Sequence, residues 1–131
     1  MSDAVKRSLK VWLAAIALIV AAVSIWAVPV IFRSFAAVHQ RDVTRELAEW
    51  KLQYSNITSD EDASRTADVL GYVQTYYVPS DGYRSDSTTE AMLEAQRSET
   101  VDALVAALKT YSKRDFGKDA SAWKKAIEQR P

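Results

Sequence analysis

The 131-residue chain has no cysteine, one histidine, three glycines and three prolines. Without cysteine there is no disulfide, no thiolate nucleophile and no cysteine-ligated metal. A single histidine, His39, excludes a site built on several histidines, and we interpret it as a polar residue near a membrane surface. Three glycines are too few for a glycine-rich phosphate loop. We therefore expect no catalytic residue, no metal site and no cofactor.

The net charge of zero hides an uneven distribution. Residues 34–104 carry 6 Lys and Arg against 13 Asp and Glu, whereas residues 105–131 carry 7 against 3. A nucleic-acid-binding protein needs a larger and more continuous basic face, so we expect no nucleic-acid partner. We interpret the basic C-terminal segment as a solvated helix end or as the rim of a docking surface.

Residues 11–32 are the longest uncharged stretch, and Lys10 and Arg33 flank them. As a helix they measure about 33 Å, enough to cross a hydrocarbon core of about 30 Å. Twelve of them are Leu, Ile, Val or Phe, which favours membrane insertion by about 4–7 kcal/mol. The stretch is longer than the apolar part of a cleavable signal peptide and has no convincing cleavage site. The sequence predicts an uncleaved transmembrane helix over residues 11–32.

The basic tail before this helix indicates its orientation. Lys6, Arg7 and Lys10 precede the span, whereas Arg33 alone follows it closely. Positive residues stay on the cytoplasmic side. We therefore expect residues 1–10 to be a cytoplasmic tail and the C-terminal domain to be periplasmic or extracytoplasmic, in the inner membrane of a bacterium.

Small side chains recur along one side of the span, at Ala14, Ala17, Ala21 and Ser24. Such faces let membrane helices approach one another closely. The same residues also fit an ordinary alanine-rich anchor. Trp26 lies deeper than an interfacial residue needs to be, and it faces a partner helix, a pigment or lipid.

Beyond the membrane the sequence predicts helices only. Residues 33–58 form an amphipathic helix and a connector, with the apolar stripe Val43, Leu47, Trp50 and Tyr54. Residues 59–131 form a helical hairpin domain with a short final helix. The predicted fold class is all-α, with one N-terminal transmembrane helix followed by a small domain of about four helices.

Capping residues place the helices of the hairpin domain. Ser59 with Asp62, or Thr58 with Glu61, resembles a capping box that opens the second helix, and Gly71 inside it predicts a close helix crossing. Ser87 with Glu90 predicts the start of a third helix, which ends near residue 112. Residues 78–86 form the one long loop.

The segment Arg114-Asp-Phe-Gly-Lys-Asp-Ala-Ser-Ala-Trp123 resembles the C-terminal closure of bacterial HEAT-repeat-like domains, and the resemblance covers residues 60–130. It implies a structural cap made of Phe116, Gly117, Asp119 and Trp123, and it implies protein–protein contact without catalysis. We expect Trp123 to be buried against the third helix, near Leu104 and Leu108. Because solenoids need about three repeats, the open face of one helix pair must be covered by the Val43–Tyr54 helix or by another protein.

Aromatic residues supply the candidate interaction surface of the domain. It consists of Tyr72, Tyr76, Tyr77, Tyr83 and the neighbouring Arg84. Tyrosine is enriched in interface hot spots, although half of these tyrosines also fit a core.

Together these features predict a non-catalytic, single-pass accessory or scaffold subunit of a larger membrane protein complex. Respiratory complexes and photosynthetic reaction-centre–antenna complexes are the host assemblies that we would examine first. Integral membrane subunits would contact the transmembrane helix, and a protein partner would contact the domain. The alternative is a free membrane-anchored adaptor or sensor whose domain binds a soluble protein.

Overall fold

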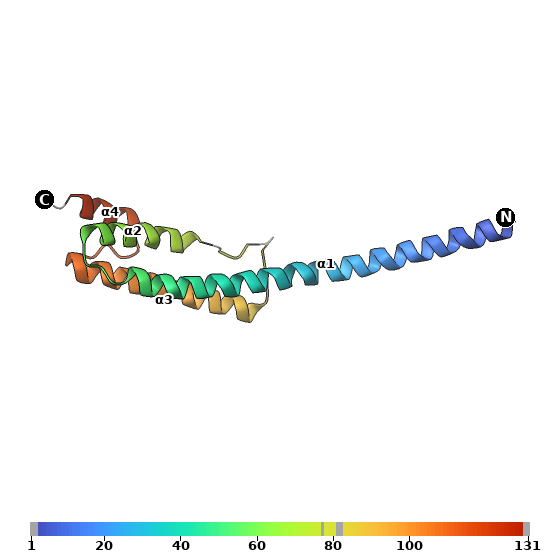
Figure 1. The fold of residues 1–131 in the computed structure, drawn as a ribbon, viewed down its shortest axis with the longest axis horizontal. Coiled ribbons are helices and arrows are strands. Elements are labelled where there is room, and N and C mark those ends of the chain that lie inside the picture. The colour runs from blue at the N-terminus through green and yellow to red at the C-terminus, as the bar shows by residue number, and fades with distance from the viewer. Residues whose placement is uncertain (1–2, 77, 81–82, 130–131) are drawn as a thin grey trace.

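The computed structural model describes residues 3–76, 78–80 and 83–129. Four helices lie within these ranges, and no strand does: α1 (Asp3–Tyr54), α2 (Asp60–Thr75), α3 (Ser87–Ser112) and α4 (Ala120–Glu128) (Figure 1). The predicted all-α class with about four helices is confirmed. Residues 3–10 of the predicted basic tail, the span and the amphipathic helix are parts of one helix, because α1 continues through Pro29 and Arg33 without interruption.

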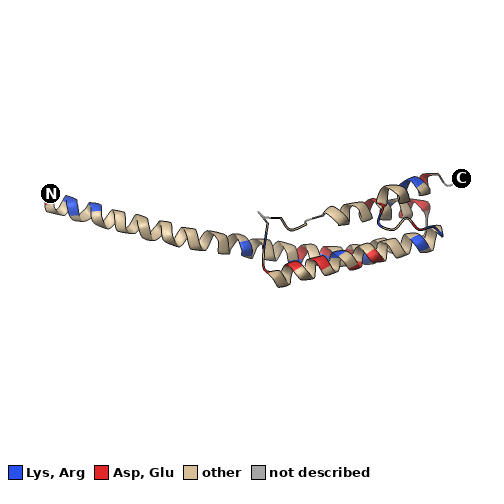
Figure 2. Cartoon of the chain, turned by 180° about the vertical axis from the view of Figure 1, so that it is seen from behind, with Lys and Arg blue, Asp and Glu red and all other residues tan. Residues whose placement is uncertain are grey.

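The first half of α1 projects away from the rest of the molecule (Figure 1). Among the described residues it is the stretch long and apolar enough to cross a membrane, and none of its most apolar window is buried inside the chain. Charged residues lie near its N-terminal end and again where the bundle begins, with none between (Figure 2). The start of α1 and the end of α4 lie at opposite ends of the molecule (Figure 1).

The second half of α1 is a central element of the folded domain. It packs along α3 and touches α2, and α2 packs against both α3 and α4. Periodic apolar positions of all four helices form one buried core: Val43, Leu47, Ala63, Ala67, Leu70, Val73, Leu93, Val101, Leu104, Leu108, Trp123 and Ile127. The open face of the α2–α3 pair is thus covered by α1 of the same chain.

Two predicted helix starts differ in their outcome. Ser59 is the N-cap of α2, and its hydroxyl accepts a hydrogen bond of 3.1 Å from the backbone N–H of Asp62, as expected. The N-cap of α3 is Asp86, and the prediction of a cap at Ser87 is wrong. The Asp86 carboxylate has two acceptor oxygens, and they accept from the backbone N–H and the hydroxyl of Thr89 at 2.8 and 2.7 Å.

Helix α4 packs chiefly on α2. The close crossing predicted at Gly71 is present: a Cβ atom added there would lie 3.2 Å from Cβ of Ala120 at the start of α4. The missing side chain of Gly71 therefore lets the two helices approach. Trp123 is fully buried and belongs to the same core cluster as Leu104 and Leu108.

Candidate functional site

The small residues of the predicted membrane helix, Ala14, Ala17, Ala21 and Ser24, are exposed on the projecting half of α1. Trp26 lies on the same stretch, with 73% of its surface exposed. The chain itself therefore leaves this side of the helix open. A neighbour with close backbone contact would have room there, because the four side chains are short.

Three aromatic rings form a cluster at the junction of α1 and α2, and we call Trp50, Tyr72 and Tyr76 the aromatic triad. Their ring centroids lie 4.7–5.7 Å apart. Such separations are typical of favourable aromatic pairs. Tyr72 keeps 53% of its surface exposed, whereas Trp50 and Tyr76 are half-buried. The triad therefore presents the exposed ring of Tyr72, which packs on the half-buried rings of Trp50 and Tyr76.

Polar contacts hold the triad in place. The hydroxyl of Tyr76 donates to a carboxylate oxygen of Glu46 on α1 at 2.8 Å. Arg97 of α3 is buried, and its guanidinium donates to the backbone carbonyls of Val73, at 2.6 Å, and of Tyr76. These carbonyls lie at the C-terminal end of α2, where a positive charge also complements the helix dipole. Arg97 thus fixes the end of α2 that carries Tyr72 and Tyr76.

The other predicted tyrosines do not join the triad. Tyr83 lies beside His39, with ring centroids 5.8 Å apart in a T-shaped arrangement. Tyr77 lies outside the described residues. Arg84 is exposed and pairs with Glu90 at 2.9 Å. The single predicted surface is therefore two groups along α1, one at His39 and the other at Trp50.

A buried glutamine attaches the segment before α3 to α1. Gln40 has no exposed surface, its amide nitrogen donates to the carbonyl of Tyr83 at 3.2 Å, and its amide oxygen accepts from the hydroxyl of Ser85. Sequence reasoning missed Gln40 and Arg97. Each occupies a position in register with an apolar stripe, three residues before Val43 and four after Leu93, and that register is the signal that marks them as buried.

The residues of the predicted cap converge around Trp123. Its indole N–H donates to the carbonyl of Gly117 at 2.8 Å, and its ring packs edge-on against Phe116 with centroids 5.0 Å apart. Gly117 has a positive φ of 55°, which glycine adopts without strain. Asp119 caps α4 by accepting from the backbone N–H of Ala122 at 3.0 Å. These contacts close the core around Trp123 and stabilise the domain.

Electrostatic contacts on the domain are local. Capping and turn hydrogen bonds lower the pKa of several exposed carboxyls. The largest contribution comes from the hydroxyl of Thr58 for Asp62, the backbone N–H of Thr89 for Asp86, and the hydroxyl of Ser121 for Asp119. A hydrogen bond to Asp68 raises the pKa of Lys124.

Some of the basic residues in the C-terminal segment form ion pairs within the chain. Three lysines pair with aspartates: Lys109 with Asp115, Lys118 with Asp102 and Lys124 with Asp68. Positive and negative residues alternate along the bundle (Figure 2). Within the part of the chain that the structure describes, no group of three or more His, Asp or Glu side chains is placed to hold a metal ion.

Comparison with protein-family models, curated proteins and solved structures gives no match for this chain. The resemblance to HEAT-repeat-like domains therefore stays a prediction.

Proposed function

We propose that the chain is a non-catalytic, single-pass accessory subunit of a larger membrane protein complex. The observation that carries the proposal is the division of α1. Its first half exposes large apolar side chains that no part of the described chain covers, whereas its second half is built into the domain core. A helix that is apolar on all sides is stable only inside a protein or a membrane.

The continuity of α1 supports a bridging role. Residues 33–54 continue the span as the same helix, so a contact made in the membrane also fixes the direction of the domain. At a rise of about 1.5 Å per residue they extend about 33 Å beyond Arg33. The aromatic triad lies near the far end of this length. One rigid element thus presents one surface within the membrane and one above it.

We further propose that the small-residue face, Ala14, Ala17, Ala21 and Ser24, packs on a helix of a host subunit. The aromatic triad and, at the separate group near His39, Arg84 serve protein contact outside the membrane. Lys6, Arg7 and Lys10 support a cytoplasmic N-terminus and an extracytoplasmic domain, in the inner membrane of a bacterium. Respiratory and reaction-centre–antenna complexes remain the hosts to examine first.

The topology is tested with reporters fused after Pro131. We expect a reporter that works only outside the cytoplasm to be active and a cytoplasm-only reporter to be silent. The opposite pair of results would reverse the orientation and place the domain in the cytoplasm.

Purification in mild detergent tests the function. An accessory subunit migrates with a large complex at fixed stoichiometry, whereas a free adaptor or sensor migrates alone. The adaptor alternative draws on the exposed triad and on the acidic balance of residues 34–104, which would suit a soluble basic partner. Migration alone in every mild detergent would favour the adaptor.

Paired leucine substitutions test the small-residue face. Ala17→Leu with Ala21→Leu keeps the span apolar but separates it from a close neighbour, so we expect membrane insertion without co-purification of the complex. Ala15→Leu with Ala22→Leu makes the same chemical change on another side of the helix and should co-purify normally. Normal co-purification of both variants would show that the helix only attaches the domain to the membrane.

A further inference from the structure

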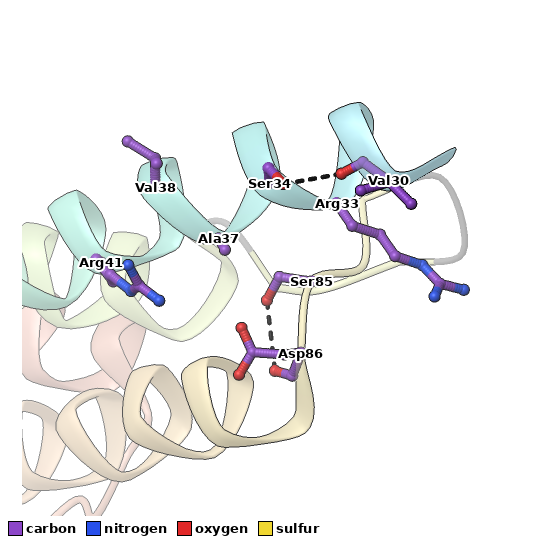
Figure 3. Close-up of a pocket in the computed structure, with 8 residues that line it drawn as sticks. All are labelled: Val30, Arg33, Ser34, Ala37, Val38, Arg41, Ser85 and Asp86. Carbon is purple, nitrogen blue, oxygen red and sulfur yellow. Dashed lines mark hydrogen bonds between the residues drawn. The ribbon is translucent and has the colours of Figure 1, made fainter. Parts of the chain in front are cut away.

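An open hollow of about 520 Å³ lies where α1 enters the domain, between this helix and the residues just before α3 (Figure 3). Val30, Ala37 and Val38 supply its apolar wall on α1. The polar lining comes from both sides of the hollow: Arg33, Ser34, Arg41, Ser85 and Asp86. The hollow therefore combines apolar surface with charges of both signs.

Two arginines flank the hollow. Arg33 and Arg41 extend from α1 toward the side on which Ser85 lies, one on each side of it (Figure 3). Both are exposed, and neither forms an ion pair with any residue that the structure describes. Guanidinium groups bind phosphate oxygens through two parallel hydrogen bonds. The hollow is thus suited to a phosphate group.

The position of the hollow along α1, just beyond the predicted span, indicates the source of that phosphate. Arg33 is the first charged residue after the predicted span. Large apolar side chains stay exposed for another turn and more, at Phe35 (70%) and Val38 (56%). A shallow apolar groove of about 240 Å³ adjoins the hollow and shares its residues Val30 and Val38. An acyl chain would lie in this groove while its headgroup reaches the arginines.

Asp86 restricts the headgroup further. Its carboxylate lines the hollow while capping α3 through Thr89. Hydrogen bonds from the backbone N–H and hydroxyl of Thr89 lower its pKa, so it is ionised at neutral pH. A purely anionic headgroup would be repelled by this carboxylate. A headgroup with both a phosphate and an ammonium group satisfies the arginines and Asp86 together.

We propose that this hollow binds one phospholipid with an ammonium-bearing headgroup, its phosphate between Arg33 and Arg41 and its ammonium near Asp86. The proposal rests on the proposed function only in taking residues 11–32 as the membrane span. It needs no host complex, so the lipid-site proposal and the accessory-subunit proposal can be contradicted independently. A chain that binds the lipid but migrates alone supports the lipid site and contradicts the accessory-subunit role.

The test uses the full chain, delipidated in detergent and then titrated with phosphatidylethanolamine, with bound lipid counted by native mass spectrometry. We expect one retained lipid. Arg33→Gln and Arg41→Gln should each weaken lipid retention about tenfold, because each removes one charge-assisted hydrogen bond to the phosphate. Arg45→Gln is the control, because Arg45 pairs with Asp42 at 3.2 Å and does not line the hollow. Equal retention by all variants, with unchanged circular dichroism, would overturn the proposal.

Other ligands separate the headgroup from its alternatives. Phosphatidylglycerol and diacylglycerol should bind more weakly than phosphatidylethanolamine. Free phosphoethanolamine should not compete at equal concentration, because it lacks the acyl chain. Asp86→Asn keeps an N-cap residue and should remove the preference for ethanolamine over glycerol. Equal competition by phosphoethanolamine would identify a soluble-anion site, and an unchanged preference in Asp86→Asn would remove the ammonium contact. Either result would overturn the proposal.

Discussion

The two halves of α1 share one unbroken backbone but present opposite surfaces. In residues 3–32, bulky apolar side chains are exposed, as at Ile25 (77%) and Trp26 (73%). In residues 33–54, apolar side chains such as Val43 and Leu47 are buried, and polar residues occupy the solvent side. Both halves are α-helical. What differs is whether the apolar residues surround the helix or follow one stripe.

This difference separates two sources of stability. The stripe in the second half gains free energy by leaving water, and the domain supplies its partners. As the proposed membrane span, the first half would gain comparable free energy from lipid without any particular protein neighbour, so a specific contact there would have to come from shape and close packing. The same substitution should therefore change the stability of the domain when it is made in the core, but not when it is made in the first half of α1.

The largest difference is expected between two tryptophans. Trp123→Ala removes a fully buried ring together with its hydrogen bond to Gly117 and should cost about 3–5 kcal/mol of domain stability. Trp26→Ala removes a ring that no part of the domain contacts, so the domain should unfold at the parent temperature. Near-UV circular dichroism of the full chain in detergent measures both. A parent-like melting curve for Trp123→Ala would contradict the role of the cap.

The periodic parts of this fold follow directly from the sequence. The stripes of α1, α2 and α3 repeat every three to four residues, and Ser59 and Asp119 have the side chains that cap helices, so these elements could be placed. The cap of α3 was misplaced by one residue because Asp86 and Ser87 are both good capping residues. Local pattern does not choose between them; the path of the preceding segment does.

The candidate surfaces were harder to predict because they depend on contacts between distant residues. Tyr72 and Tyr76 lie together since they are one turn apart on α2, but Trp50 joins them from another helix. Tyr83 is close in sequence yet lies beside His39, where the loop path brings it. Gln40 and Arg97 are polar types that usually indicate exposure, and only the folded chain supplies the carbonyls they bind.

A smaller difference is expected between two arginines. Arg97→Met keeps most of the side-chain volume but leaves the carbonyls of Val73 and Tyr76 without this donor, so we expect a loss of about 1–3 kcal/mol. Arg65→Met removes an exposed partner of Glu61 within one helix and should cost less than about 0.5 kcal/mol. Thermal unfolding of both variants measures the difference. Similar losses would mean that Arg97 does not fix the end of α2.

The smallest effect is a gradual loss of domain stability in acid. Hydrogen bonds at the N-terminal ends of α2, α3 and α4 hold the pKa of Asp62, Asp86 and Asp119 below the ordinary value of 3.8. The largest contributions come from the Thr58 hydroxyl, the Thr89 backbone N–H and the Ser121 hydroxyl, respectively. A carboxyl whose folded pKa is lowered stabilises the fold above its unfolded pKa and loses that contribution as the pH falls through the folded value. The melting temperature should therefore be flat between about pH 6 and 8 and decline below about pH 4.

Asp86→Asn supplies the control for this pH dependence. Asparagine still accepts the hydrogen bond from Thr89 but does not titrate, so the variant should show a shallower decline in acid with little change at pH 7. The proposed span has no part in this loss, because residues 11–32 contain no ionisable carboxyl, and its helical signal should persist at the pH where the domain loosens. A melting temperature that is the same at pH 3.5 and pH 7 would show that these caps contribute nothing. Simultaneous loss of both signals would show that the two halves of α1 unfold as one unit.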